Sequence, residues 1–369
     1  MILSNELPYL RSSTERIIVQ FSQAMSLEDM KLQSAPVDDF LKKLLADFAE
    51  PMRQRLEAEF FDCGPISKLL FDLKVTEIII NGGRQIWYER EAQWQKLEDE
   101  FLSPSTFRNW VHRISNEAGM VFDLNQPFAN GRWRDFRVHV ACQPLVHCEF
   151  HVSLRRQSVE PWSLAKLEEL GWADRRSADL LSTIIKSEAN ILFVGTTGSG
   201  KTSVLSASLN EIEPNQRAIL IEDTDELPIP NSCSTKMLSR DGTGDGLKSF
   251  DLSDLVKQSL RMRPHRIVIG EIRGGEAKDL LLALATGHRG SFGTMHAETA
   301  PQALLRLEML VQIGAPQWSL QTIRQLIALS LNYIVVCGFA NGQRVLGGIY
   351  KLAALESCGF LLEPVADHP

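Results

Sequence analysis

The sequence predicts an α/β protein, with a domain built on a mostly parallel sheet preceded by a smaller α+β domain and a helical N-terminal segment. Its 369 residues, 44% hydrophobic and 23% charged, suffice for about two globular domains. In the second half, strand-like and helical patterns alternate, as they do in parallel sheets. Earlier in the chain, Asn-Gly pairs separate strand-like runs, as in hairpins. The predicted boundaries are 1–60 for the helical segment, 61–157 for the α+β domain, 158–178 for a linker and 179–369 for the α/β domain.

The first 157 residues account for the helical segment and the α+β domain. Residues 40–48 place apolar side chains at helical spacing among charged ones. Farther along, Asn81-Gly82-Gly83 and Asn130-Gly131 predict hairpin turns between strand-like runs. The linker that follows carries Pro161 and a short helix.

The segment 195–202 matches the phosphate-binding loop pattern G-x-x-x-x-G-K-T. An apolar run at 191–194 predicts a buried strand leading into it, and 202–212 predicts a helix leading out. Glycines let the backbone curl and point N–H groups at anionic oxygens. A chance glycine-rich turn is the alternative, but all the fixed positions and both flanks favour triphosphate binding. The candidate nucleotide-binding residues are Gly195, Thr196, Thr197, Gly198, Ser199, Gly200, Lys201 and Thr202.

Two of these residues have distinct expected roles. Lys201 is placed to reach the β- and γ-phosphates, and the Thr202 hydroxyl to bind a Mg²⁺ ion that bridges them. The loop alone does not separate ATPases, GTPases and small-molecule kinases.

Carboxylates follow two downstream strands. In a parallel sheet the ligand lies at the carboxyl ends of the strands, so these acids are expected beside the loop. Glu271 follows the run 266–269 and is the candidate for activating a water molecule. It is preceded by Gly270, where many phosphate-loop enzymes carry a magnesium-binding aspartate.

The other acids follow the run 218–221. Because the aspartate is missing at position 270, Glu222 and Asp223 are expected to serve the metal together with Thr202. The alternative for this acid cluster, above all for Asp225 and Glu226, is a helix cap or a solvated turn.

His296 ends a glycine-rich segment and follows a strand-like run, 291–295. A neutral imidazole at a strand end near the γ-phosphate would sense or polarise it. The alternative is a histidine with a purely structural role.

The order of these motifs resembles that of the type II/IV secretion ATPase superfamily. The loop resembles its Walker A motif, 221–227 its Asp box, 260–277 its Walker B motif and 286–297 its His box. Within the superfamily the sequence is most similar to the CpaF/TadA-like ATPases of tight-adherence pili, which are near the ATPases of type IV secretion and conjugation. The resemblance covers roughly residues 60 to 350.

The resemblance implies a RecA-like ATPase domain capped by the N-terminal domain, in a ring-shaped homo-hexamer that uses ATP and Mg²⁺. It implies a cytoplasmic motor at the inner face of the inner membrane, attached only through platform proteins of a pilus or secretion machine. Such a motor drives pilus assembly or retraction, or protein export. Two alternatives remain: a traffic ATPase of type IV secretion or conjugation, and a nucleotide-gated scaffold with little turnover. By the same resemblance the Walker A ligands are Lys201 and Thr202, the Asp-box acid is Glu222, the catalytic glutamate Glu271 and the His-box histidine His296.

Arginines are expected to complete the site, because a guanidinium placed on the developing charge accelerates phosphoryl transfer. Arginines on hairpins are mostly solvated, and the resemblance favours Arg137, Arg155 and Arg240 as catalytic over the others. The sequence departs from the family at His265, where aspartate is usual, and this puts one salt bridge in doubt. It is also shorter at the N-terminus than many relatives, so an extra targeting module is expected to be reduced or absent.

Composition bounds the remaining possibilities. The net charge of −7 and the pI of about 5.7 argue against nucleic acid as the main ligand. No apolar run approaches the roughly 18 residues of a membrane span, and the first residues lack the layout of a signal peptide. The six cysteines form no C-x-x-C pair, so neither zinc nor a disulfide framework is indicated. Residues 363–369 are expected to form a loose tail.

Overall fold

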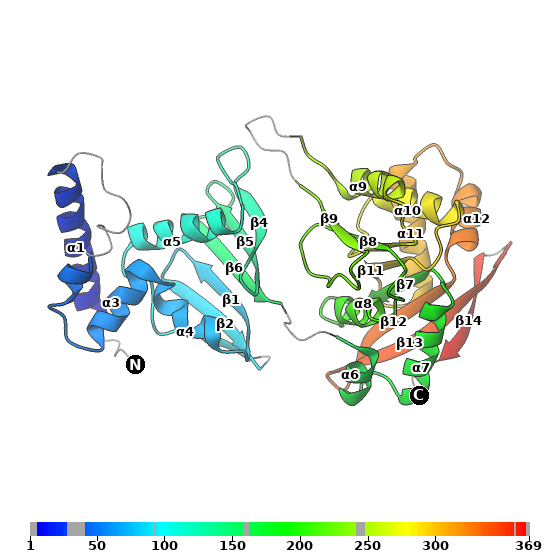
Figure 1. The fold of residues 1–369 in the computed structure, drawn as a ribbon, viewed down its shortest axis with the longest axis horizontal. Coiled ribbons are helices and arrows are strands. Elements are labelled where there is room, and N and C mark those ends of the chain that lie inside the picture. The colour runs from blue at the N-terminus through cyan, green and yellow to red at the C-terminus, as the bar shows by residue number, and fades with distance from the viewer. Residues whose placement is uncertain are drawn as a thin grey trace. The chain divides into compact units, whose positions relative to one another are not determined.

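The chain folds into two compact units, Met1–Ser158 and Val159–Pro369. A computed structural model describes residues 6–27, 41–91, 93–157, 162–240, 248–357 and 359–366 (Figure 1).

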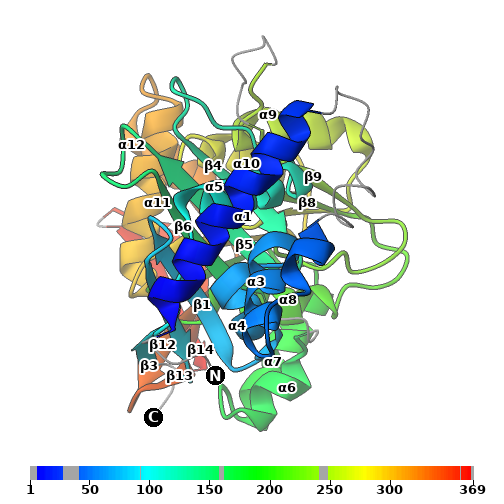
Figure 2. The ribbon, with the colours of Figure 1, turned by 90° about the vertical axis from the view of Figure 1, so that its left-hand side faces the viewer.

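The first unit begins with helices that pack into a small core of their own. Helix α1 (Leu7–Leu27) packs against α3 (Met52–Phe61), as Figure 2 shows, and residues 41–45 are also helical. The helical N-terminal segment is thus confirmed within the described residues. Its core consists of Leu10, Ile17, Leu41, Leu45, Leu56 and Leu102.

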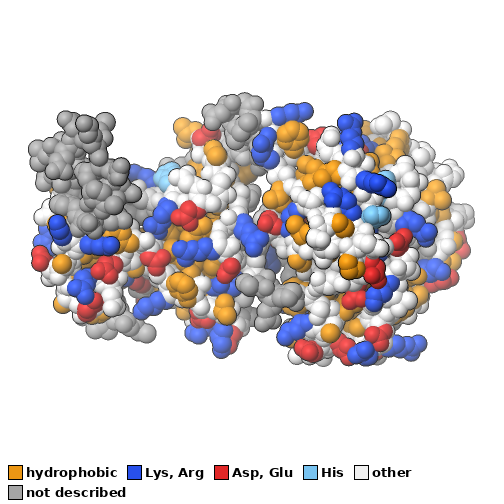
Figure 3. Space-filling model, viewed as in Figure 1, with side chains coloured by type: hydrophobic (Ala, Val, Ile, Leu, Met, Phe, Trp, Pro, Cys, Tyr) orange, Lys and Arg blue, Asp and Glu red, His pale blue; other side chains and the backbone are white. Residues whose placement is uncertain are grey.

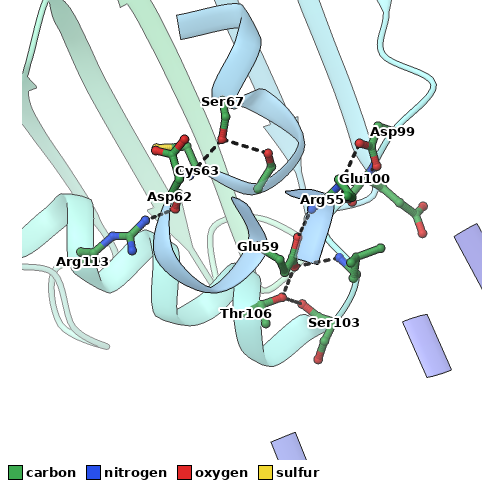
Figure 4. Close-up of polar contacts among 12 residues, drawn as sticks. Arg55, Glu59, Asp62, Cys63, Ser67, Asp99, Glu100, Ser103, Thr106 and Arg113 are labelled. Atoms are coloured by element: carbon green, nitrogen blue, oxygen red, sulfur yellow. Dashed lines mark hydrogen bonds and ion pairs between the residues drawn. The ribbon is translucent and has the colours of Figure 1, made fainter. Parts of the chain in front are cut away.

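A buried polar network joins α3 to the sheet part of this unit (Figure 4). The Arg55 guanidinium donates to Glu59 at 2.8 Å and to Asp99 at 2.8 Å. The Glu59 carboxylate is fully buried and also accepts from the Leu102 amide at 2.9 Å and from the Thr106 hydroxyl. Because every charge in this network has a partner, burial is tolerated.

The rest of the first unit is an antiparallel sheet in the strand order β3-β2-β1-β6-β5-β4. Two short helices, η1 and α4, precede its first strand, and α5 lies between β3 and β4 along the chain. The elements are η1 (Gly64–Ile66), α4 (Ser67–Phe71), β1 (Val75–Asn81), β2 (Gln85–Arg90), β3 (Gln93–Lys96), α5 (Pro104–Glu117), β4 (Phe128–Trp133), β5 (Phe136–Cys142) and β6 (Phe150–Arg156).

The two faces of this sheet differ in character. One face is apolar and packs on α5 through residues such as Phe107 and Trp110. On the other face Arg137 stands directly opposite Arg155, and Arg155 opposite Glu77, so one polar row crosses three strands.

Of the two predicted hairpin turns, one is confirmed and one is wrong. The turn after Asn81 joins β1 to β2, with Asn81 opposite Gln85. Asn130-Gly131 lies inside β4, and the chain turns instead after Trp133, where Arg134 has a φ of 52°. Gly131 is a packing residue, since a Cβ there would lie 2.5 Å from Cγ of Met120.

The second unit is built on an eight-stranded sheet in the order β14-β13-β12-β7-β11-β10-β8-β9. The six strands from β12 to β9 run parallel, and β13 and β14 are antiparallel, which confirms a mostly parallel sheet. The elements are α6 (Leu164–Glu169), α7 (Arg175–Lys186), β7 (Ile191–Gly195), α8 (Lys201–Leu209), β8 (Ala218–Glu222), β9 (Thr235–Leu238), α9 (Leu252–Ser259), η2 (Leu260–Met262), β10 (Arg266–Ile269), α10 (Glu276–Ala285), β11 (Phe292–His296), α11 (Ala300–Gly314), α12 (Leu320–Ser330), β12 (Tyr333–Ala340), β13 (Gln343–Glu356) and β14 (Gly359–Ala366).

Helices cover both faces of this sheet, so three of its central strands, β7, β8 and β10, carry uninterrupted apolar runs at 191–194, 218–221 and 267–269. In β7, Leu192 and Val194 belong to the core shared with α9 to α12, and Ile191 and Phe193 to the core shared with α6 to α8. The same alternation runs along β8 and β10. This arrangement explains why these strands are uninterrupted apolar runs in the sequence.

Two further segments complete the second unit. Helix α6 lies in the segment where a linker with a short helix is expected, and its Leu164 and Leu167 pack into the core shared with α7 and α8. The predicted loose tail is wrong for residues 363–366, which belong to β14 and pair with β13 as far as Ala366 opposite Ile349. The last three residues lie outside the described part.

Charged side chains of both signs are interspersed on the face shown in Figure 3. None of the helices that the structure describes is long and apolar enough to cross a membrane.

Candidate nucleotide-binding site

Strand pairing places the phosphate-binding loop in the middle of the large sheet. Strand β7 ends at Gly195, which lies opposite His296 of β11 on one side and Cys337 of β12 on the other. A Cβ at position 195 would lie 2.3 Å from the Cys337 carbonyl oxygen. Only glycine fits between these two strands. The close packing fixes the position of the backbone at Gly195, where the loop begins.

The loop itself uses two glycines in the left-handed region. Gly198 has a φ of 77° and Gly200 a φ of 92°, and Gly200 caps the N-terminus of α8. Inside the loop the Ser199 hydroxyl donates to the Thr196 carbonyl at 2.8 Å. Thr202 is exposed on the first turn of α8. The loop thus leads directly into the N-terminus of α8, the arrangement that a cradle for anionic oxygens requires.

Lys201 is the cation of this cradle. Its ammonium donates to the carbonyl oxygens of Gly195 at 3.0 Å and Thr196 at 2.8 Å, and lies 3.3 Å from Nδ1 of His296. Burial lowers the pKa of Lys201, while the Glu271 carboxylate acts to raise it. The charge is thus held in place at the loop rather than exposed to solvent.

His296 connects Lys201 to Glu271. Its Nε2 lies 3.0 Å from Oε1 of Glu271, on the opposite side of the ring from Lys201. Burial, followed by the charge of Lys201, lowers the pKa of His296. A neutral ring satisfies both contacts with one tautomer, since Nδ1 accepts from Lys201 and Nε2–H donates to Glu271.

Arg273 ties the two acid clusters together. It forms an ion pair with Asp223, and its Nε lies 3.8 Å from Oε2 of Glu271. Asp223 also accepts from the Ser239 hydroxyl at 2.7 Å. No pattern in the sequence distinguishes Arg273 from the neighbouring arginines.

Glu222 has its carboxylate occupied within the protein. It accepts from the Leu227 amide at 3.0 Å and the Glu226 amide at 3.2 Å, and its Oε2 lies 3.1 Å from Lys236. Burial raises the pKa of Glu222 to about 7, against the opposing effect of Lys236. Asp225 also pairs with Lys236, so both acids help to shape the turn after β8.

The side chain of Glu222 explains why position 270 is a glycine. A Cβ at position 270 would lie 3.0 Å from Cγ of Glu222. The side chain from the neighbouring strand thus fills the space beside the backbone where many phosphate-loop enzymes carry an aspartate. This packing offers a physical reason for the glycine that the sequence alone left unexplained.

The charged residues and the histidine of the predicted site, apart from Glu222, fall into three groups. Lys201, His296 and Glu271 meet at the loop, and Asp223 is joined to them through Arg273. Arg240 lines a neighbouring cavity of about 460 Å³, where its guanidinium lies 5.5 Å from the centre of the Phe250 ring. Arg137 and Arg155 belong to the first unit.

The family is shown by comparison with known proteins. Residues 59–338 match the family described as type II/IV secretion system protein. The chain belongs to this family. It is an ATPase of this family.

Individual relatives agree with this assignment. A putative conjugal transfer protein of Mycobacterium tuberculosis is 31% identical over 266 residues, which cover 70% of this chain and 76% of the relative. The type IV secretion system protein VirB11 of Bartonella quintana is 28% identical and covers 78% of this chain and 90% of its own length. Among solved structures, the pilus retraction motor PilT with bound ADP shares the fold, with a TM-score of 0.57, 24% identity, and coverage of 79% of this chain and 83% of PilT.

Proposed function

We propose that this type II/IV secretion ATPase hydrolyses ATP as a subunit of a hexameric ring that powers a tight-adherence pilus or protein export through the inner membrane. The chain of contacts from Lys201 through His296 to Glu271 is the observation that carries the proposal. It joins the phosphate-binding cation to the carboxylate best placed to activate water. Nucleotide binding alone does not require a contact between the phosphate-binding lysine and a carboxylate that activates water.

Each residue in this chain has a proposed task. Lys201 binds the β- and γ-phosphates, and Glu271 orients a water molecule for attack on the γ-phosphorus and takes its proton. His296 donates to Glu271 and so holds its carboxylate in position. Because its other nitrogen faces Lys201, it is also placed to respond when phosphate draws the lysine away.

Mg²⁺ is the proposed metal, and the donors suit it, since it prefers oxygen ligands and keeps several waters. Thr202 would bind it directly, and it would offset the charge of the phosphates. Asp223 and Glu222 are proposed to act through water, because their carboxylates already have protein partners.

Arg137, Arg155 and Arg240 remain the proposed source of the guanidinium that acts on the γ-phosphate. In the first unit, Arg137 and Arg155 stand side by side on one sheet face, which would concentrate positive charge. The proposed partners are further copies of this chain and the platform proteins of the machine. We place the motor in the cytoplasm, at the inner face of the inner membrane, attached through those partners.

Type IV secretion or conjugation is a second candidate, favoured by the conjugal transfer protein and VirB11 among the relatives. A host strain carrying Glu271→Gln in place of the natural gene distinguishes the candidates. Loss of surface pili supports the first proposal, whereas loss of plasmid transfer with pili intact supports the second.

The basic test is ATP turnover by the purified full chain, with its assembly state measured by native mass spectrometry. Turnover by a hexamer is expected. A protein that binds ATP but shows no turnover in any assembly state is instead a nucleotide-gated scaffold.

A further inference from the structure

The hairpin formed by β12 and β13 extends beyond the phosphate-binding loop. Strand β12 pairs with β7 as far as Cys337 opposite Gly195, where β7 ends, and then continues to Ala340. The chain turns at Asn341 and Gly342, which have φ angles of 51° and 79°. The hairpin tip therefore projects past the edge of the sheet from which the loop starts.

Arg344 brings this hairpin into direct contact with the loop. Its Nε donates to the Gly198 carbonyl oxygen at 2.8 Å. A Cβ at Gly200 would lie 3.4 Å from Cδ of Arg344. Within the described residues, the terminal nitrogens of the guanidinium make no hydrogen bond, so they remain available beside the loop.

Phe339 lies on the same face of the hairpin as Arg344. The two residues are directly opposite each other in the register, and such pairs point to one side of a sheet. Two positions earlier, the pair Cys337 and Leu346 is buried in the core shared with α8, the helix that follows the loop. Phe339 therefore faces the loop side of the hairpin, and it is 51% exposed.

We propose that this hairpin forms the nucleoside side of the nucleotide site, with Phe339 stacking on the purine base. Arg344 is a positioning residue, which holds the loop through Gly198 and offers its terminal nitrogens to phosphate oxygens. The inference rests on the proposed function, because it takes the loop as the place where the phosphates bind. Both residues lie beyond the range 59–338 that matches the family.

General chemistry favours a base as the occupant. A nucleotide whose phosphates lie in the loop must place its base beside it, and an aromatic ring offers a flat apolar surface for stacking. Stacking tolerates any base but grows with ring area, so purines are expected to bind better than pyrimidines. The planar guanidinium of Arg344 suits phosphate oxygens.

Binding of Mg²⁺-ADP and Mg²⁺-pyrophosphate to the full chain, measured by calorimetry, tests the proposal. Phe339→Ala is expected to weaken ADP binding by about tenfold or more, as loss of a stacked base does, and to leave pyrophosphate binding unchanged. Arg344→Ala is expected to weaken both ligands. Gln343→Ala, on the opposite face of the same hairpin, is the control and is expected to affect neither.

A rescue variant guards against misfolding. Phe339→Trp keeps a stacking surface and is expected to bind ADP like the wild type, with tryptophan fluorescence that is quenched by ADP and not by pyrophosphate. Unchanged ADP binding by Phe339→Ala, with ATP turnover intact, overturns the inference alone and marks Phe339 as a surface for another protein. Equal loss of ADP and pyrophosphate also overturns it. Absence of turnover in the wild type overturns the proposed function instead.

Discussion

Nε2 of His296 lies 3.0 Å from Oε1 of Glu271, at the ends of two neighbouring parallel strands. The contact makes the His-box and Walker B residues one unit. It also gives separate, measurable roles to residues that motif order alone would only group together.

Replacing Glu271 by Gln is expected to abolish most ATP turnover while leaving nucleotide binding intact. An amide cannot take the proton of the attacking water, and loss of a general base typically costs on the order of 10²–10⁴ in rate. Turnover at saturating ATP and ADP affinity are the measurements. Glu363→Gln, exposed on β14, is the matched control and should behave as the wild type. Undiminished turnover in Glu271→Gln would assign water activation elsewhere.

The pH dependence of turnover should report the neutral form of His296. Burial lowers its pKa below 6.5, so the ring accepts from Lys201 at neutral pH and loses this capacity only as the pH falls through the lowered value. We expect kcat to decline on the acid side below pH 6.5, with an apparent pKa under the ordinary histidine value.

In His296→Gln the decline of kcat at acid pH should disappear. At neutral pH, kcat of this variant should fall by roughly tenfold to a hundredfold. If His296→Gln keeps the wild-type decline of kcat at acid pH, another group titrates in that range.

Glu222 should make folding stability depend on pH. Its pKa is raised from 4.5 to about 7, so between these values the folded protein binds more protons than the unfolded chain. Stability from this group is complete below pH 4.5 and is lost as the pH rises through about 7. Compared with Glu222→Gln, the wild type should lose on the order of 1 kcal/mol or more across this range. Denaturant unfolding of both proteins at several pH values measures the difference, and parallel curves would contradict it.

Gly270→Ala is expected to destabilise the second unit. The added methyl group meets Glu222, whose buried carboxylate is fixed by its hydrogen bonds and cannot easily move. Overpacking of this kind costs about 1–3 kcal/mol. Gly338→Ala is the control, because a Cβ there has open space around it. Equal unfolding midpoints for the two variants would show that Glu222 yields to the methyl group.

The sequence was most informative where spacing and chemistry coincide. The loop needs a buried strand before it and a helix after it, and residues 191–209 provide both. The convergence of Lys201, His296 and Glu271 follows from the parallel order of β7, β11 and β10, which strand–helix alternation made predictable.

Other features depended on contacts that no local pattern shows. Asn130-Gly131 reads as a turn, yet Gly131 serves close packing against Met120, which is set by tertiary structure. The engagement of Glu222 by Lys236 joins residues of adjacent strands, and the contact of Arg344 with Gly198 spans 146 positions. Contacts between residues so far apart in the sequence cannot be predicted from a local pattern without knowledge of the fold.

The network around Glu59 has a consequence for how this protein changes over time. Its carboxylate is shared by Arg55, the Leu102 amide and Thr106, so a change at one position leaves a charge or a donor without its partner. Substitutions at positions 55, 59 and 106 should therefore be tolerated together and selected against singly. Homologues that have lost the arginine at position 55 should also have lost the glutamate at position 59. The two positions should therefore covary among homologues.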